Sequence, residues 1–338
     1  MRNLFALIVF ASSIVSCDRY GTSDNTAIVN SILFPEPPIE IMSNIDSEST
    51  AKDYVMLNWY NIVQVNKNLY YMWYAAFGSS SGDSDIEQGL FFAYSNDAFH
   101  WRRVFPNGAD NTIVSKGIQE QYVFRVSFDN SMPFRMIANV IDKGKFKLCM
   151  WSSQDGYSWE MDKKKVLLDD LLHDTQNVMI EREGKLNLYT RLWNKTNTNR
   201  RNGICEFDFS GNLLTQIDTL AGDYLYNAAT SYLDNKYDLL LPTYMNNKEG
   251  DSPSDNTYIK SYLCHKKEVV EVDNDFNRWL KPDEKWVSFA PGFLEVDGKT
   301  YLSYMTCTWS HDSKRPSNGV TRYYLIRVEM TIDGKKIN

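Results

Sequence analysis

The stretch LNWYNIVQVNKNLYYMWYAA, residues 57–76, holds two runs of apolar and aromatic residues separated by a short polar turn. β-Branched and aromatic runs bounded by turn residues are typical of β-strands. Two such runs joined by a short turn predict an antiparallel hairpin. The run at residues 185–192 alternates at period two, which indicates a strand with one buried face.

The hairpin pattern recurs along the chain, and this repetition decides the architecture. Four further copies span residues 123–140, 177–193, 228–244 and 289–306, and no stretch shows helical periodicity over three turns. Five units of about four short antiparallel strands account for the chain after about residue 50. A closed ring of such units leaves few strand edges exposed. The sequence therefore predicts an all-β fold, a five-bladed β-propeller, within a single domain at residues 51–338.

A second repeated phrase joins a strand, a tight turn and a tryptophan. YSNDAFHW at residues 94–101 is echoed by WSSQDGYSW at residues 151–159. Asp, Gly and Ser favour tight turns, and such turns belong on the outer strands of a blade. We therefore expect Trp101 and Trp159 to pack within the blades and not to stack on a ligand.

Composition excludes some classes of function. Of the 338 residues 14% are aromatic, which is ample for a large core and excludes global disorder. The net charge of −7 argues against nucleic acid as a partner, because phosphate contacts need clustered Lys and Arg. The histidines form no metal-spaced cluster and no CxxC pair occurs, so neither a metal site nor a cofactor is predicted.

Four cysteines follow residue 17, each in or beside an apolar or aromatic run: Cys149, Cys205, Cys264 and Cys307. Free thiols buried in the core are the favoured interpretation. A disulfide stays open as the alternative in an oxidising compartment.

The N-terminus has the pattern of a signal peptide. Arg2 precedes a mostly apolar stretch at residues 4–15, which is too short to span a bilayer as a mature helix. The stretch ends in Ile14-Val15-Ser16-Cys17, which resembles the lipobox of bacterial lipoproteins. We predict a signal peptide at residues 1–17 and lipidation of Cys17. The protein would be secreted and anchored to the bacterial outer membrane, on the cell surface or the periplasmic side. Ordinary signal-peptidase cleavage is the alternative. Residues 18–50 are polar and are interpreted as a tether from the membrane, followed by a segment that lies across the surface of the domain.

Candidate binding residues lie where the inner strand of each predicted blade begins, because these starts surround the propeller axis. Amides and hydroxyls predominate there, and such groups suit neutral polyols, whose hydroxyls both donate and accept hydrogen bonds. The residues expected to contact a ligand are Asn58, Trp59, Tyr60, His173, Gln176, Asn177, Arg191, Tyr226, Asn227 and Ser288. Arg191 has a surface position as its alternative, and His173 is expected at the rim of the site.

Several motifs resemble a known group of propellers. They are the two turn phrases, HDTQNV at residues 173–178 with LYTR at 188–191, DYLYNAA at 223–229 with LLLP at 239–242, and the segment at residues 128–136. Together they resemble the five-bladed propellers of glycoside hydrolase families 43 and 32 and their uncharacterised relatives, over about residues 55–330. The resemblance implies a carbohydrate partner and action on a glycosidic bond of an oligo- or polysaccharide in the axial pocket.

Glycoside hydrolysis needs two carboxyl groups across the scissile bond, one protonated and one ionised. Asp174, as base or nucleophile, and Glu120, as acid, are the best pair that the predicted blade starts offer. The alternative for Asp174 is a turn cap that accepts backbone N–H bonds. The alternative for Glu120 is an ordinary loop carboxylate.

The chain departs from the family pattern in its first blade. Family 32 and 43 enzymes carry a catalytic Asp near the start of that inner strand, whereas residues 57–61 here read LNWYN. An amide such as that of Asn58 cannot act as nucleophile or general base. A glycan-binding surface lipoprotein without catalysis is therefore the rival hypothesis. The polar ring at the blade starts argues against a third class, a pure interaction scaffold.

Overall fold

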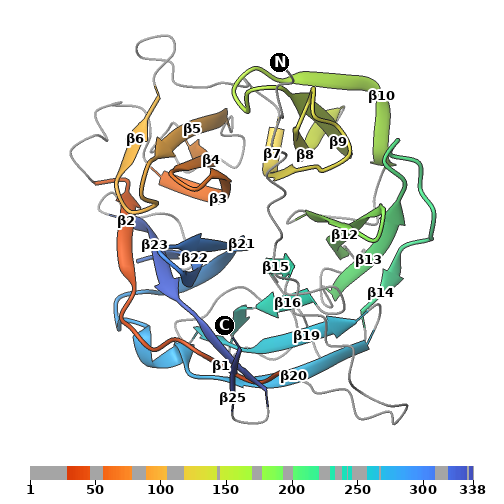
Figure 1. The fold of residues 1–338 in the computed structure, drawn as a ribbon. Helices are drawn as coiled ribbons and strands as arrows, with labels where there is room; N and C mark the ends of the chain where they lie inside the picture. The colour runs from red at the N-terminus through yellow and green to blue at the C-terminus, as the bar shows by residue number, and fades with distance from the viewer. Residues whose placement is uncertain are drawn as a thin grey trace, which may run out of the picture.

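The computed structural model describes residues 29–45, 56–77, 89–104, 118–142, 145–169, 177–192, 201–220, 229–232, 238–241, 243–245, 257–265, 268–308, 319–332 and 335–337. Within these ranges the chain forms β-strands and one 3₁₀ helix, η1 (Phe276–Trp279). The sheets stand around a common centre as the blades of a propeller (Figure 1). No helix in the described ranges is long and apolar enough to cross a bilayer.

Five sets of four antiparallel strands form the blades, and each blade begins with its innermost strand. Blade I contains β3 (Met56–Asn66), β4 (Leu69–Phe77), β5 (Gly89–Ser95) and β6 (Trp101–Arg103). Blade II contains β7 (Ile118–Arg125), β8 (Phe134–Asp142), β9 (Lys145–Ser153) and β10 (Glu160–Asp169). Blade III contains β11 (Val178–Arg182), β12 (Lys185–Leu192), β13 (Arg201–Phe207) and β14 (Asp218–Thr219).

Strands from the ends of the chain add to the last two blades. Blade IV contains β15 (Ala229–Tyr232), β16 (Asp238–Leu241), β19 (Ser261–His265) and β20 (Glu268–Asn274), with the separate hairpin β17 (Thr243–Met245) and β18 (Thr257–Ile259) inserted between β16 and β19. Blade V contains β21 (Trp286–Val296), β22 (Lys299–Cys307), β23 (Thr321–Arg327) and β2 (Ile39–Ser43).

The five innermost strands close a ring. Contacts run from β3 to β7, from β7 to β11, from β11 to β15, from β15 to β21, and from β21 back to β3. Each of the five hairpins predicted from the sequence is present as the first two strands of a blade. The predicted all-β, five-bladed propeller is therefore confirmed.

The N-terminal segment takes part in the propeller from residue 29. β2 pairs with β23 as the outermost strand of blade V, and it buries Ile41 and Met42. β1 (Val29–Leu33) lies parallel to β20 and antiparallel to β24 (Glu329–Ile332), and β25 (Lys335–Ile337) follows at the edge. The structure places residues 29–33 and 39–43 in the sheets, whereas the sequence predicts only a tether and a surface segment for residues 18–50. Short apolar runs between polar residues gave too little signal to reveal two strands that pair with distant parts of the chain.

The hydrophobic core lies between the blades. One buried cluster joins blades V and I, where the rings of Tyr60 and Tyr323 stack with centroids 3.8 Å apart. Another joins blades I and II around Trp73, whose indole N–H donates to the carbonyl of Gly156 at 2.7 Å. A Cβ added at Gly156, where φ is 77°, would lie 2.8 Å from the Trp73 ring, so this turn of blade II needs glycine.

The repeated turn phrases adopt one structure in two blades. The carboxylate of Asp97 accepts the N–H groups of Phe99 and His100 at 2.9 and 2.8 Å. The carboxylate of Asp155 does the same for the two N–H groups that follow Gly156. Trp101 is buried and donates to the carbonyl of Ala98 at 2.8 Å, which supports its predicted structural role.

The four cysteines after residue 17 are buried and form no disulfide, as the favoured interpretation predicts. Burial raises the pKa of Cys205 and of Cys264 to about 12. In the described part of the chain no three His, Cys, Asp or Glu side chains gather closely enough to hold a metal ion.

Candidate functional site at the propeller axis

Two inner strands carry a β-bulge at equivalent places. In blade I, Leu57 pairs with Ala76 and Tyr60 pairs with Tyr74, so Asn58 and Trp59 are inserted between them. In blade II, the same irregularity inserts Glu120 and Gln121 between the paired residues Gln119 and Tyr122. Bulges redirect side chains and are common beside active sites. Three residues predicted from the sequence, Asn58, Trp59 and Glu120, therefore lie in matching bulges near the starts of neighbouring inner strands.

The two bulges are joined by buried amides. The side chain of Gln121 donates to the carbonyl of Trp59 at 3.1 Å. Two residues further along each strand, Asn61 donates to the carbonyl of Val123 at 2.6 Å and accepts its N–H at 3.1 Å. An amide that satisfies both backbone groups of one residue imitates a strand partner. These three bonds fix the register between the inner strands of blades I and II.

Blades II and III are joined by a second set of amides. Asn177 donates to the side-chain oxygen of Asn139 at 3.3 Å and accepts the hydroxyl of Thr190 at 2.6 Å. Asn177 is 0% exposed, and Asn139 and Thr190 are buried as well. Asn177 was predicted to contact a ligand. Its amide is instead hydrogen-bonded to two buried side chains, so we assign it a role in positioning the strands.

Tyr60 also differs from its prediction. It is 1% exposed, its ring stacks on Tyr323, and its hydroxyl donates to the carbonyl of Tyr304 at 2.8 Å. Burial raises the pKa of the Tyr60 hydroxyl. A side chain with its ring packed and its hydroxyl bonded in the core has no surface left for a ligand. The period-two alternation that places a residue at a strand start does not reveal which neighbouring blade its side chain faces.

Trp59 and Ser288 are buried with polar atoms that lack a partner. The indole N–H of Trp59 and the hydroxyl of Ser288 make no hydrogen bond, although the residues are 3% and 1% exposed. Buried polar groups in folded proteins are nearly always paired, so an unpaired one on an inner strand is a candidate for contact with a ligand.

The remaining predicted residues fall outside what the structure describes. His173, Asp174, Gln176, Tyr226, Asn227 and Cys17 lie outside the described ranges, and for Asn58, Glu120 and Arg191 only the backbone is described. The backbones of Asn58 and Glu120 lie in β3 and β7, and that of Arg191 lies in β12.

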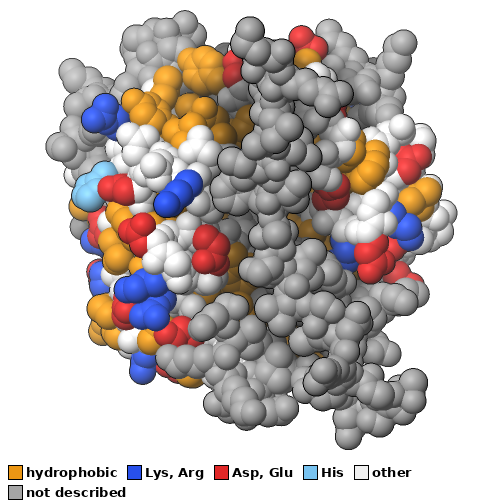
Figure 2. Space-filling view, in the orientation of Figure 1, with side chains coloured by type: hydrophobic (Ala, Val, Ile, Leu, Met, Phe, Trp, Pro, Cys, Tyr) orange, Lys and Arg blue, Asp and Glu red, His pale blue; other side chains and the backbone are white. Residues whose placement is uncertain are grey.

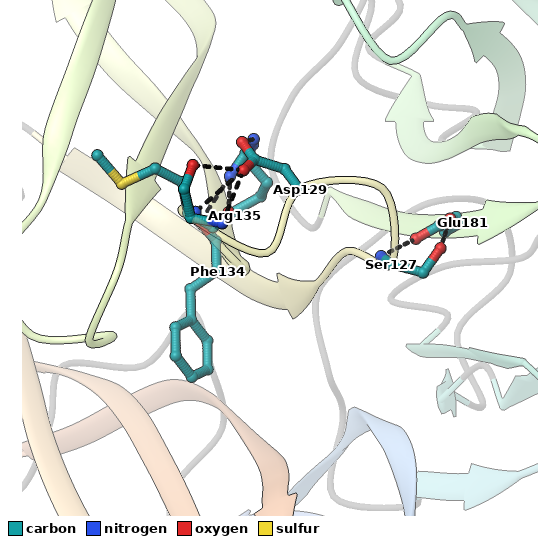
Figure 3. A network of polar contacts seen from close by, with 7 residues as sticks. Ser127, Asp129, Phe134, Arg135 and Glu181 are labelled. Carbon is teal, nitrogen blue, oxygen red and sulfur yellow. Dashed lines mark hydrogen bonds and ion pairs between the residues drawn. The ribbon is translucent and has the colours of Figure 1, made fainter. Parts of the chain in front are cut away.

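The opposite ends of the inner strands hold a polar network that sequence reasoning missed in part. Glu181 accepts the backbone N–H of Ser127 at 2.8 Å and also its hydroxyl, which joins blades II and III (Figure 3). Nearby, Asp129 pairs with Arg135 at 2.8 Å. The hydroxyl of Ser131 and the Arg135 guanidinium hold the pKa of Asp129 well below its usual range. Asp129 lies in the turn between β7 and β8, and its hydrogen bonds to Ser131, Met132 and Arg135 are made within that hairpin.

A buried ion pair joins blades III and IV at that same end. Arg182, the last residue of β11, bonds to Asp238, which also accepts the hydroxyl of Tyr189. Asp238 and Tyr189 are buried. No pattern in the sequence identifies this pair, because its members belong to different blades. Its place at the end of β11 separates it from the strand starts, so we assign it to the joining of the blades.

Charge on the outer surface is mixed. On the described part of the face in Figure 2, Lys and Arg side chains alternate with Asp and Glu side chains and do not gather into one patch.

Comparison with known proteins adds to this picture at the level of the fold. No family model and no curated protein matches the sequence. Solved structures do match. A family 32 β-fructofuranosidase of Bombyx mori superposes with a TM-score of 0.56 at 12% identity, over 83% of this chain and 61% of that chain. This chain thus spans about three fifths of the silkworm enzyme.

Two further matches cover most of both chains, and one of them is a family 43 enzyme. The α-L-arabinofuranosidase PaAbf62A of Podospora anserina, solved with cellotriose, has a TM-score of 0.56 at 11% identity, over 89% of this chain and 96% of that chain. A family 43 β-1,3-galactosidase, solved with galactodeoxynojirimycin, has a TM-score of 0.56 at 11% identity, over 92% and 97%. At such identities the likeness establishes the fold alone. The chain has the five-bladed propeller fold of the glycoside hydrolases of families 32 and 43, as its motifs predict.

Proposed function

We propose that the protein acts on a glycosidic bond of an oligo- or polysaccharide at the end of the axis where the inner strands begin. The observation that carries the proposal is the pair of matching bulges in β3 and β7, which present Asn58, Trp59, Glu120 and Gln121 at the inner ends of two adjacent blades. Propellers of this fold include enzymes solved with sucrose and with cellotriose.

Glu120 is the proposed general acid. It occupies the second-blade bulge position that corresponds to Asn58 in the first blade. The family resemblance implies a catalytic Asp near Asn58, so this chain has an amide where a carboxylate is implied and a carboxylate one blade further round the ring. Asp174 is proposed as the second carboxyl group, acting as base or nucleophile across the scissile bond.

The test is a search for released sugar. Wild-type protein would be incubated with sucrose, cellotriose, arabinoxylan, β-1,3-galactan and β-1,2-mannobiose, and products would be separated by chromatography. The Asp174→Asn and Glu120→Gln variants should lower turnover by orders of magnitude, because an amide is isosteric with a carboxyl group but neither acidic nor basic. Asp297→Asn is the matched control: Asp297 is exposed in the turn after β21, at φ 51°, where asparagine fits.

A second function, glycan binding without cleavage, is favoured by one observation: residues 57–61 contain no carboxylate. The same experiment separates the two functions. Release of product that depends on Asp174 supports hydrolysis. Binding of a glycan by calorimetry, with no product from any substrate, supports the binding module.

We further propose that Cys17 is the lipidated N-terminus of a surface or periplasmic lipoprotein. The apolar stretch that ends in Ile14-Val15-Ser16-Cys17 supports this. Several acyl chains, each CH₂ contributing about 0.8 kcal/mol, would anchor the protein stably. Mass spectrometry of the natively expressed protein should find a diacylated or triacylated Cys17 at the N-terminus. An intact Met1, or cleavage elsewhere without lipid, would contradict the proposal.

A further inference from the structure

Trp59 packs away from the rest of its own strand. Its neighbours Tyr60 and Ile62 belong to the buried cluster between blades V and I. Trp59 instead belongs to the cluster that joins blades II, III and IV, together with Tyr122 and Val178. β7 stands between β3 and β11 in the ring, and it contributes Tyr122 and Phe124 to this cluster. The bulge at Asn58 and Trp59 provides the change of direction.

The backbone of Trp59 is held firmly. Its carbonyl accepts the Gln121 amide at 3.1 Å, and Asn61 ties the same strand to Val123 through two bonds. Trp59 is only 3% exposed. An indole so restrained presents its N–H in one direction at little further cost in conformational entropy.

The N–H of this indole has no acceptor. The two other tryptophans of blade I differ: Trp73 donates to Gly156 at 2.7 Å and Trp101 donates to Ala98 at 2.8 Å. An unmade hydrogen bond at a buried donor costs free energy that a ligand or water oxygen recovers. A buried, unpaired donor on a bulged inner strand is a candidate for an oxygen acceptor that reaches it once the groups covering it move aside.

From these observations we infer that a bound sugar displaces the groups that cover the Trp59 indole nitrogen, and that this N–H then donates a hydrogen bond to a hydroxyl or ring oxygen of the sugar. The inference rests on the proposed carbohydrate function and deepens it. It assigns the donor, and it makes Trp59 a binding residue that acts through its N–H.

The test compares Trp59→Phe with the matched control Trp73→Phe, since both substitutions remove an indole N–H and the same ring volume. The probes are sucrose, cellotriose, β-1,2-mannobiose and β-1,3-galactobiose, measured by calorimetry. Trp59→Phe should weaken binding of the sugar that the wild type prefers by about 3- to 10-fold, the range for one neutral hydrogen bond. Trp73→Phe should retain wild-type affinity while lowering the melting temperature more, because it breaks a bond made within the free protein.

A second measurement needs no substitution. In protein labelled with ¹⁵N at the indole nitrogens, the Trp59 resonance should shift and its hydrogen exchange should slow when the sugar is added, while the Trp73 resonance stays unchanged. This measurement tests the inference even if the Trp59→Phe variant fails to fold. If the wild type binds a sugar but Trp59→Phe binds it equally well, or the Trp59 resonance is unmoved, the inference fails and the proposed function stands. If the wild type binds none of the four sugars and releases product from none of the substrates of the activity screen, both fail.

Discussion

The amide of Asn61 offers the sharpest test of how the ring of inner strands is held together. Asn61 is buried, and its side chain satisfies both the N–H and the carbonyl of Val123 on the neighbouring blade. The Asn61→Ala variant would leave both backbone groups without a partner in a buried place. Each unsatisfied group costs about 1–3 kcal/mol. Allowing for partial relaxation, we expect the free energy of unfolding to fall by about 3 kcal/mol.

Urea unfolding, followed by tryptophan fluorescence, measures this loss. The midpoint should fall while the slope against urea stays the same, since the surface exposed on unfolding hardly changes. Asn61→Asp should be destabilised at least as much at neutral pH, because it adds a buried charge and loses the donor to the Val123 carbonyl. Asn96→Ala, in an exposed bend, is the control and should change stability by less than about 0.5 kcal/mol. An Asn61→Ala variant as stable as this control would refute the reasoning.

Three further predictions concern other parts of the fold. Met42→Ala on β2 should lower the unfolding free energy by about 2–4 kcal/mol, because Met42 is 4% exposed. Ile39→Ala, at 41% exposure on the same strand, should lower it far less. Equal losses by urea unfolding would argue against the packing of β2 onto blade V. Because its partners lower the pKa of Asp129, the stability that this carboxylate contributes is present above its unfolded pKa of about 4 and is lost as the pH falls. Asp129→Asn should therefore flatten the acid limb of a midpoint-against-pH curve, and an unchanged acid limb would count against the pairing. Cys205, whose pKa burial raises to about 12, should resist a thiol reagent at pH 8 in the native protein and react in denaturant, and rapid native labelling would show that the core opens.

The sequence predicts the blades well because each one begins with a local hairpin. The hairpins at residues 57–76 and 289–306 were visible because their strands are adjacent in the chain and their turns are short. The tight turns at the aspartates could be predicted for the same reason, because Asp97 bonds to residues two and three positions further along the chain.

What the sequence did not reveal depends on pairing over long distances. β2 completes a blade formed by the other end of the chain, and Arg182 meets Asp238 from another blade. The inward direction of individual side chains was equally hidden. Tyr60 and Trp59 are consecutive, yet a bulge sends them to different clusters, one with its polar atom bonded and the other without a partner.

The most direct test is a crystal structure of the protein with the oligosaccharide that it prefers in the binding screen. We expect a sugar at the end of the axis where the inner strands begin, beside the bulges of β3 and β7 and hydrogen-bonded to the Trp59 indole N–H. A sugar bound on the outer strands, or at the opposite end near Glu181 and Asp238, with none at the strand starts, would contradict the proposed site.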